Sequence, residues 1–398
     1  MFIQILLAII FGILCGTFTG LVPGLHTNLL SIILLGLYPF FSGVVSGTSF
    51  CIIIVSLAIS QLFIAFIPSV FLGAPSPENI FGALPGHRML LMGKGLLAVK
   101  IMAFACFFSL FMCILIIPFV FFLIQGIFNY FKSSVPFILI AVSAIMILRE
   151  KGLRARIWAG IVFIFSGILG LIALNSDISQ PLFPMLSGLF GVGMLIASAL
   201  SDSEIPFQEE EGIFEGRNFL MCIAAAVFSG SFVCLFPALG PSQAAAIGSE
   251  LVEENDENYL AITGGISSVN IMISIVFLLA IGKARNGAIA VLGRIANLNY
   301  GLVIALSICA LVSAAIALFS TIIISRKFAL IIPRINYKKL CAAMIAFMLI
   351  MSFILSGFAG IILLFAASSI GLIPNLLGIR RAHAMGALII PVIGYYLF

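Results

Sequence analysis

The chain has 398 residues, of which 63% are hydrophobic and only 8% are charged, and its formal net charge is +5 at pH 7. This balance excludes an ordinary soluble domain and indicates a polytopic membrane protein. The small positive charge gives no reason to expect a nucleic-acid partner, because the basic residues gather in short loops, as membrane topology requires. The first apolar run, residues 3–22, has no basic start and no small-residue cleavage site, so we expect a retained membrane helix.

Apolar segments separated by polar or Pro/Gly-rich breaks fill the chain, and each predicts a helix. Some approach the ~20 residues that a bilayer requires, whereas others are short enough to be half-helices or re-entrant pieces. The segments are 3–22, 27–46, 48–72, 96–124, 134–149, 156–174 and 183–200, then 218–236, 241–254, 258–281, 301–324, 339–357, 358–373 and 384–397. We predict a first transmembrane repeat at 1–200, an acidic polar linker at 201–217 and a second transmembrane repeat at 218–398.

The cysteines and acidic residues are distributed differently. Eight cysteines lie at scattered positions in apolar segments without a Cys-x-x-Cys pair, which predicts small buried side chains. Eleven of the fourteen acidic residues fall in 202–215 and 250–257, where solvated surfaces explain them. Of the other three, Glu150 lies in a basic loop and Asp177 in a polar loop. Only Glu78 lies inside a candidate membrane motif.

A Pro/Gly break near the N-terminus recurs about two hundred residues later. Residues 16–28 align with residues 230–243, and in both copies an apolar run ends at the break and restarts with small polar residues. The matched pairs are Gly16 with Gly230, Phe18 with Phe232, Leu21 with Leu235, Pro23 with Pro237 and Leu25 with Leu239. A membrane helix that is interrupted at depth and restarted has this pattern. Interrupted helices at matching places in two halves are typical of transporter binding sites.

Two further matches and the loop charges predict how the halves are related. Residues 71–88 align with 277–294, and 182–188 with 372–378, in the same order. The loops at 149–156 and 326–339 are basic, whereas their counterparts in the other half carry little charge. By the positive-inside rule, equivalent loops then face opposite sides, with both basic loops cytoplasmic. The predicted fold is an all-α polytopic membrane protein with two inverted-topology repeats and broken or re-entrant helices.

The breaks supply the first set of candidate binding residues. A restarted helix presents unpaired backbone N–H groups and the positive end of its dipole, and two such ends can hold a carboxylate or a phosphate. The alternative is that proline and glycine merely kink packed helices. The candidate residues are Pro23, Gly24, His26, Thr27 and Asn28 in the first half, and Pro237, Gly240, Ser242 and Gln243 in the second.

The matched blocks near residues 73–80 and 282–287 supply a second set. Glu78 and Asn79 follow two prolines that a helix cannot pass undisturbed, and Arg285 and Asn286 lie in the partner block. Glu78 can bind a cation or a proton, and Arg285 can hold an anion. The alternative is that these charges are hydrated at a membrane surface.

Other polar residues and motifs give weaker signals. His26, His87 and His383 fall in or beside matched blocks and suit proton coupling, but lone histidines commonly serve packing. Asn270 and Gln61 lie at comparable places in the two halves, and helix–helix hydrogen bonding explains them as readily as a ligand does. No nucleotide-binding loop, nucleophile elbow or His-Glu-x-x-His motif occurs. We therefore expect no enzyme, no metal and no cofactor, only a coupling H⁺ or Na⁺.

These motifs resemble the large membrane subunit of tripartite tricarboxylate transporters, a TctA-like permease, and look closest to its shorter prokaryotic or archaeal branch. The resemblance rests on residues 20–26 with their echo at 235–241, and on residues 83–89 followed by Gly93-Lys94-Gly95. It implies an ion-driven carrier for citrate-like or other organic anions, fed by a small membrane subunit and an extracytoplasmic binding protein. The chain departs from the family at Ala238, where the first half has Gly24, and at the Pro75–Glu78 tip.

The leading hypothesis is thus a multi-pass permease of the cell membrane for an organic anion such as a di- or tricarboxylate, working by alternating access. The runner-up is a polyprenyl-phosphate translocase, because a small family thought to return that lipid carrier shows a similar Gly-x-x-Pro-Gly break. A third hypothesis is an intramembrane enzyme that uses Glu78 and the histidines, although no nucleophile–base spacing supports it. The sequence leaves a homodimer open.

Overall fold

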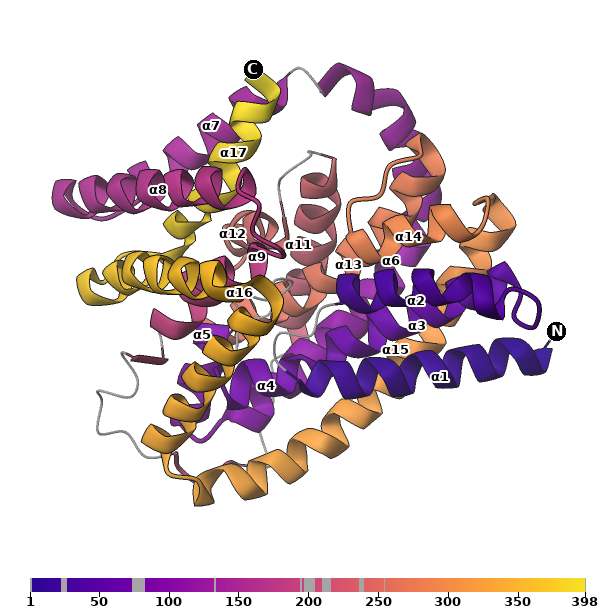
Figure 1. Cartoon of the computed structure of the whole chain (residues 1–398), viewed down its shortest axis with the longest axis horizontal. Coiled ribbons are helices and arrows are strands. Elements are labelled where there is room, and N and C mark those ends of the chain that lie inside the picture. Colours follow the sequence, from indigo (N-terminus) through magenta and orange to yellow (C-terminus); the bar gives the residue numbers. More distant parts are fainter. Residues whose placement is uncertain are drawn as a thin grey trace.

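The computed structural model describes residues 2–22, 27–73, 83–131, 134–193, 195–196, 205–209, 216–235, 240–253 and 255–397. In these ranges the chain is helical and contains no strand (Figure 1). In the first half the helices are α1 (Phe2–Leu21), α2 (Thr27–Phe41), α3 (Gly47–Ile64), α4 (Phe66–Phe71), α5 (Ala83–Leu91), α6 (Gly95–Phe131), α7 (Val135–Leu148), α8 (Leu153–Leu174), α9 (Leu182–Leu186) and the π-helical turn η2 (Ser187–Val192). In the second half they are α11 (Gly216–Cys234), α12 (Pro241–Ser249), α13 (Asp256–Ile281), α14 (Gly287–Ile295), α15 (Tyr300–Ile331), η3 (Ile332–Arg334), α16 (Tyr337–Leu377), η4 (Arg381–Met385) and α17 (Gly386–Leu397).

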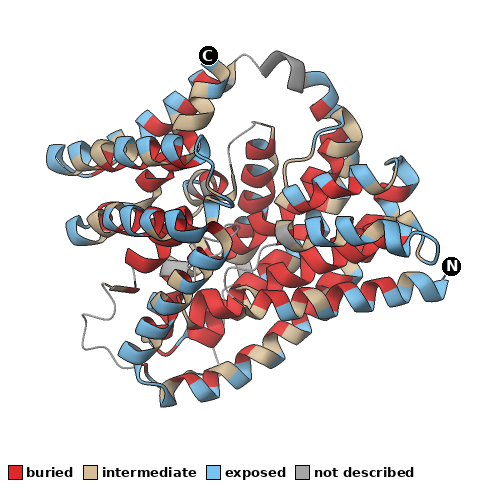
Figure 2. Cartoon of the chain, viewed as in Figure 1, coloured by how far each residue is buried: buried red, intermediate tan, exposed pale blue. Residues whose placement is uncertain are grey.

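Seven helices within the described ranges are long and apolar enough to cross a membrane. Large apolar side chains are exposed along their outer faces, for example Phe119, Phe319 and Phe365 (Figure 2). Such a surface is unfavourable in water and is suited to contact with lipid. The prediction of an all-α polytopic membrane protein is therefore confirmed.

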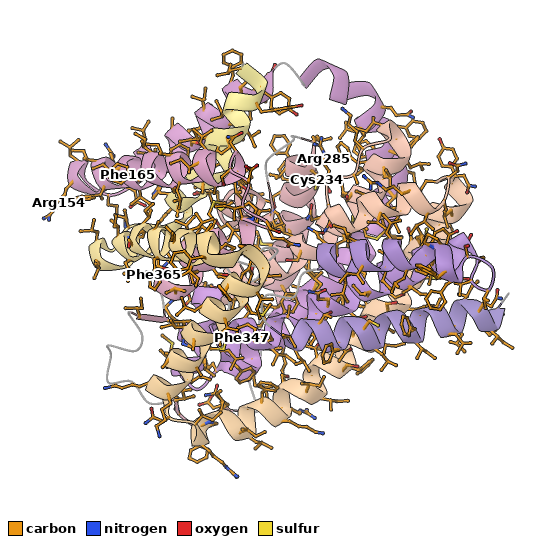
Figure 3. All side chains as sticks on the ribbon, in the orientation of Figure 1. Arg154, Phe165, Cys234, Arg285, Phe347 and Phe365 are labelled. Atoms are coloured by element: carbon orange, nitrogen blue, oxygen red, sulfur yellow. The ribbon has the colours of Figure 1, made fainter. Side chains whose placement is uncertain are left out.

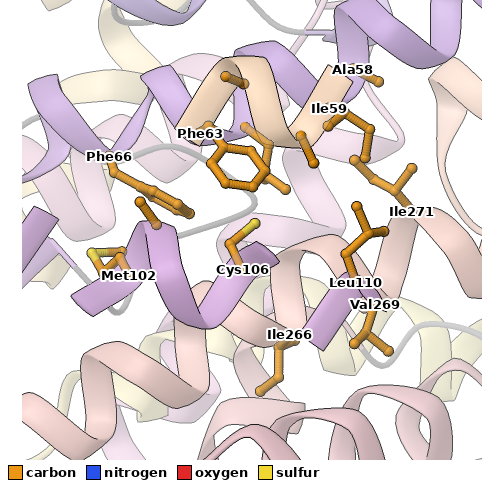
Figure 4. Close-up of a cluster of buried hydrophobic side chains, with 14 of the residues drawn as sticks. Ala58, Ile59, Phe63, Phe66, Met102, Cys106, Leu110, Ile266, Val269 and Ile271 are labelled. Carbon is orange, nitrogen blue, oxygen red and sulfur yellow. The ribbon is translucent and has the colours of Figure 1, made fainter. Parts of the chain in front are cut away.

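The larger of two hydrophobic cores gathers around α3, α6 and α13. Helix α3 is apolar on all sides and is almost completely buried, because neighbouring helices enclose it. Figure 4 shows Phe63 and Phe66 meeting Met102 and Cys106 of α6, with Ile266 of α13 nearby. Helices α1, α2, α4, α5, α11, α12, α14 and α15 and the first part of α16 complete this unit, which we call the larger body.

The smaller core lies between α7, α8, α9, η2, the second part of α16, η4 and α17. We call this unit the smaller body. On α8, a Cβ atom on Gly170 would clash with the backbone of Ala387 in α17, so only glycine allows this close approach. Gly188 of η2 packs in the same way on the second part of α16, and Gly371 of α16 packs against the backbone of Leu189 in η2. Figure 1 shows α8 and the second part of α16 running side by side.

Helix α16 takes part in both bodies. Its first part contributes Cys341, Met344 and Met348 to the larger core, and its second part contributes Leu363 and Ala367 to the smaller core. Between them, Gly357 has φ 63° and ψ −158°, a backbone conformation that is essentially restricted to glycine. The two separate segments predicted at 339–357 and 358–373 correspond to these two parts.

The packing partners recur between the two halves of the chain. Helix α1 packs on α3 as α11 packs on α13, and α3 packs on α15 as α13 packs on α6. Helix α8 packs on α17 as the second part of α16 packs on η2. The proposed match of 182–188 with 372–378 is wrong, because the first stretch begins α9 and its turn whereas the second ends α16. Apolar stretches align by composition alone, which explains the error.

Seven of the eight cysteines are buried and Cys15 is half-buried, which confirms that they serve as small core residues. The described part of the predicted linker, 205–209, is not simply solvated. Ile205 is buried, the side-chain oxygen of Gln208 accepts a hydrogen bond from the backbone of Gly95 at 2.8 Å, and its amide donates to Leu90 at 3.1 Å. This segment therefore rests on the turn between α5 and α6.

Candidate functional site

The turn between α13 and α14 is held by hydrogen bonds to one buried hydroxyl. The Ser274 Oγ accepts from the backbone nitrogens of Arg285, at 2.8 Å, and Asn286, at 2.9 Å. Helix α13 ends at Gly282, whose φ of 69° lies in the left-handed region that glycine adopts easily. The Asn286 Oδ1 accepts from the backbone of Ala288 at 2.9 Å and thereby caps α14. The turn thus has a fixed geometry.

Arg285 extends from this turn to the end of α11. Its Nη2 donates to the carbonyl oxygen of Leu235 at 3.3 Å, and its guanidinium lies 4.5 Å from the centre of the Phe277 ring. The neighbouring Cys234 Sγ donates to the Asn270 side chain of α13 at 3.4 Å. Figure 3 labels Arg285 and Cys234 close together. Since Leu235 is the last described residue before the second Pro/Gly break, this places a cation at that break.

The same turn also contacts the restart of the first broken helix. The Asn28 Oδ1 accepts from the backbone nitrogen of Ala288 at 2.9 Å, and its side chain lies against Gly287. Thr27, at the start of α2, is 5% exposed. Residues 285–288 are therefore in contact with the helix that follows the first break and with the helix that precedes the second.

The second restart contributes an unpaired amide. Gly240 caps α12 in an extended conformation, with Pro241 in the first turn. The Gln243 Oε1 accepts from the Gly240 backbone at 2.8 Å, which completes the cap. Gln243 is 2% exposed, and within the described ranges its Nε2 has no hydrogen-bond partner. A buried amide donor at a helix N-terminus is suited to receive an anionic oxygen.

The two predicted sets of residues thus partly merge. Asn28, Arg285 and Asn286 were assigned to separate motifs, yet one turn brings them together. Their sequence separation hid this contact, which depends on the tertiary fold. Six other candidates lie outside the described residues, as does the side chain of Ser242; the six are Pro23, Gly24, His26, Glu78, Asn79 and Pro237.

The arrangement is suited to binding an anion. Arg285 supplies a positive charge, and the N-termini of α12 and α14 supply backbone and amide donors. Among the described residues there is no cluster of three or more His, Cys, Asp or Glu side chains that could hold a metal ion.

The sequence did not reveal a cavity of about 860 Å³ between the two bodies. The larger body contributes α5, α12 and α13 to its walls, and the smaller body contributes α7, η2, the end of α16 and η4. Its charged lining residues are Arg88, Arg149, Glu250, Asp256, Arg380 and Arg381. The Arg380–Arg381 pair, directly after an apolar helix, was the available sequence signal.

Two ion pairs stand at this cavity. Arg88 of α5 bonds Asp256 of α13 at 2.5 Å, within the larger body. Arg149, at the end of α7, pairs with Glu250, at the end of α12, and so joins the two bodies. About half of each side chain in the second pair is exposed, so its contribution to stability is below about 1 kcal/mol.

A buried pair, Glu150 and His383, lies at the cavity wall, and His383 is part of the lining. The Glu150 Oε1 lies 2.8 Å from His383 Nε2 and accepts from the Arg380 backbone at 3.1 Å. His383 is 1% exposed, and burial lowers its pKa, which the hydrogen bond and charge of Glu150 offset only in part. Glu150 lies in the loop between α7 and α8, as predicted, but it is buried and its partner, 233 residues away, was not predicted.

Comparisons with known proteins agree with this architecture. The sequence model of the tripartite tricarboxylate transporter TctA family matches residues 6–386. The chain is 29% identical, over 98% of its length and 99% of the relative's, to an uncharacterized protein of Methanocaldococcus jannaschii. No solved structure matches the chain.

Proposed function

Because the chain belongs to the tripartite tricarboxylate transporter TctA family, we propose that it is the permease of a secondary carrier for an organic anion such as a di- or tricarboxylate. Its apolar helices make it a multi-pass protein of the plasma membrane. The family is a transporter family, which agrees with the expectation that the chain is not an enzyme. Membership of this family does not favour the alternative function of a polyprenyl-phosphate translocase.

One observation supports the site of this function above others: the turn that carries Arg285 contacts a residue beside each helix break, Leu235 and Asn28. Arg285 bonds the residue before the second break, and Asn28, just after the first break, bonds the same turn. A carboxylate placed there would meet a guanidinium and helix N-termini, which are strong carboxylate donors. Transporters of this architecture bind substrate where interrupted helices meet.

The two bodies offer a route to alternating access. Each has its own core, and a cavity separates part of their surfaces. In this proposal the smaller body moves against the larger one around the bound anion, and an H⁺ or Na⁺ gradient supplies the driving force. A small membrane subunit and an extracytoplasmic binding protein would deliver the substrate, as the family description implies.

Ligand-dependent thermal stabilisation of the purified chain tests the proposal. Citrate, other di- and tricarboxylates and a short polyprenyl phosphate would be compared at pH 5.5 and 7.5, with and without Na⁺. A ligand present at one hundred times its dissociation constant stabilises the native state by about 2.7 kcal/mol. We expect a carboxylate to do so, and Arg285→Gln and Asn28→Ala to abolish the shift.

The matched control is Lys283→Gln, which removes the same charge from an exposed position in the same turn. This variant should keep the full carboxylate shift. Stabilisation by polyprenyl phosphate alone would overturn the carboxylate assignment and support a lipid translocase. A carboxylate shift that survives both Arg285→Gln and Asn28→Ala would place the substrate elsewhere.

A further inference from the structure

We propose that His383 is the binding site of a coupling proton, and that a proton on its Nδ1 atom favours separation of the two bodies. The motion of one body against the other comes from the proposed function, on which this inference rests, and the inference identifies the driving ion as H⁺. His383 belongs to η4 in the smaller body and forms part of the lining of the cavity between the bodies.

One of the two ring nitrogens of His383 is already bonded. Its Nε2 lies 2.8 Å from the Glu150 Oε1, and the same oxygen accepts from the backbone nitrogen of Arg380 at 3.1 Å. A carboxylate oxygen accepts more than one hydrogen bond, so the neutral ring carries its hydrogen on Nε2 and donates it to Glu150. The other nitrogen, Nδ1, is then the atom that gains a proton.

The Nδ1 atom has no bonding partner in the closed arrangement, in which the pair of Arg149 and Glu250 joins the two bodies. His383 is 1% exposed, and within the described ranges Nδ1 has no hydrogen-bond partner. A proton added there would create a buried, charged N–H group without an acceptor, which is unfavourable. Because His383 lines the cavity, water that enters as the walls part would supply the acceptor. Proton binding and opening therefore favour each other.

Titratable groups surround the ring on all sides. Burial lowers the pKa of His383, the hydrogen bond and charge of Glu150 raise it, and the charge of Arg380 lowers it. Helix η4 packs against α7, α8, α16, α17 and η2. Around it, the described titratable residues of these elements, of the loop 149–152 and of the opposite cavity wall are Arg149, Glu150, Lys151, Arg154, Arg156, Arg380, Arg381, Tyr395 and Tyr396 in the smaller body, and Arg88, Glu250, Asp256 and Tyr259 in the larger body. Opening increases the exposure of the ring to water whatever balance these charges have.

The sign of the pH dependence follows from this difference in exposure. In the closed arrangement burial holds the pKa of His383 below its ordinary value, whereas in the open arrangement a hydrated ring approaches ~6.5. The open arrangement thus binds the proton more strongly, and acidification favours it. One proton changes the ratio of open to closed molecules by at most about tenfold per pH unit. Between pH 7.5 and 5.5 we expect this ratio to rise by about tenfold in total.

Distances between spin labels on the two bodies test the proposal in the full-length chain. One label is attached at Met92→Cys, directly after α5 in the larger body, and the other at Leu153→Cys, at the start of α8 in the smaller body. The native side chains are 65% and 74% exposed, and neither change alters a charge. With Cys15→Ser the remaining native cysteines are buried. Without any substrate, the population of longer distances should grow as the pH falls from 7.5 to 5.5. A distribution that does not change with pH would overturn the proposal.

The deciding variant is His383→Gln. Glutamine keeps an amide donor for Glu150 but binds no proton, so the response of the distances to pH should disappear. The matched control is His87→Gln in α5, because His87 is 3% exposed and its Nδ1 lies 3.1 Å from the Val70 carbonyl oxygen. This control should keep the full response. A response that persists in His383→Gln would show that another group takes the proton.

If His383→Gln does not fold, Glu150→Gln keeps the proposal open to contradiction. The new amide oxygen still accepts hydrogen bonds, but the negative charge that favours a protonated ring is gone, so the midpoint of the pH response should move to lower pH. An unchanged midpoint would contradict the proposal. The chain has three histidines, so nitrogen NMR of labelled histidine can follow each ring. One Nδ1 should titrate with the midpoint of the distance change, and the absence of such a signal would also contradict the proposal.

These measurements need no carboxylate, so the proton site and the proposed substrate fail independently. Opening that depends on His383 and pH, in a protein that no carboxylate stabilises, would retain the proton site and contradict the proposed substrate. Stabilisation by a carboxylate in a protein whose opening ignores pH would retain the substrate and overturn the proton site.

Discussion

The larger body combines bulky buried side chains with glycine contacts, such as Gly16 against the backbone of α3, whereas the smaller body relies chiefly on close approach of helix backbones. The largest fully buried side chains, including Phe63, Phe66 and Phe277, all belong to helices of the larger body. In the smaller body, Gly170 lies against the backbone of α17 and Glu150 forms a buried pair. Large side chains that interdigitate hold the larger core in one rigid arrangement, while the smaller core depends on a few specific contacts. The smaller body is therefore the one that single substitutions should disturb selectively.

The largest effect is expected from Gly170→Val. The new side chain would collide with Ala387, and we expect a loss of stability of about 3 kcal/mol, near the upper limit for overpacked cores. Amide hydrogen exchange should rise in α8 and α17 and stay unchanged in α3. The control is Gly160→Val on the same helix, where no neighbour lies within 4 Å. Equal increases in α3 and α8 would show that the two bodies unfold as a single unit.

A smaller loss is expected from Glu150→Ala. The change leaves the buried His383 ring and the Arg380 backbone nitrogen without their acceptor, at a cost of about 2 kcal/mol. Thermal unfolding would measure this loss. Asp177→Ala removes an acid from an exposed loop and should change stability by less than about 0.5 kcal/mol. Equal effects of the two substitutions would argue against the buried pair.

Acidification should destabilise the protein through its buried histidines. Burial lowers the pKa of both His383 and His87, so the unfolded chain, whose histidines titrate near ~6.5, binds protons more readily than the native state. Above that pH the free energy of unfolding is not reduced by the histidines. Below it the free energy of unfolding falls by at most about 1.4 kcal/mol per pH unit for each histidine. Between pH 7.5 and 5.5, the unfolding temperature should decrease less in His383→Gln than in the unsubstituted protein. It should decrease least in the double variant with His87→Gln. An unchanged slope in the double variant would contradict this.

The smallest change in stability, and the most selective, should come from Arg149→Gln. The pair with Glu250 joins the two bodies and is half exposed, so its loss should cost less than about 1 kcal/mol. It should nevertheless speed the reaction of a small thiol reagent with a cysteine placed in the cavity lining by Ala382→Cys, because the cavity opens more often. Arg88→Gln breaks a pair inside the larger body and should leave labelling unchanged. Equal acceleration by both would show that the ion pairs do not distinguish the bodies.

Much of the fold was predictable because membrane helices depend on local apolar composition. The predicted segments correspond to the observed helices, and the separation at Gly357 was anticipated. The sequence did not allow contacts between residues far apart in the chain to be predicted. Asn28 and Ala288 are 260 residues apart, and Glu150 and His383 are 233 apart. No local pattern specifies such partners, so the buried partner of Glu150 was not predicted, and one pair of apolar stretches was aligned at non-equivalent places.

The broken α16 has a consequence for membrane topology. Each part has about 20 residues, and at 1.5 Å per residue each is about 30 Å long, the thickness of the hydrocarbon layer. Figure 1 shows the second part turning back toward the side from which the first part comes, so we expect the element to be a helical hairpin that crosses the layer twice. Its two ends, which carry Lys338 and Lys339 at one and Arg380 and Arg381 at the other, then emerge on the same face. Gly357 thereby adds one crossing to those counted by helix length, and it returns the arginine pair to the side of the membrane where basic loops reside.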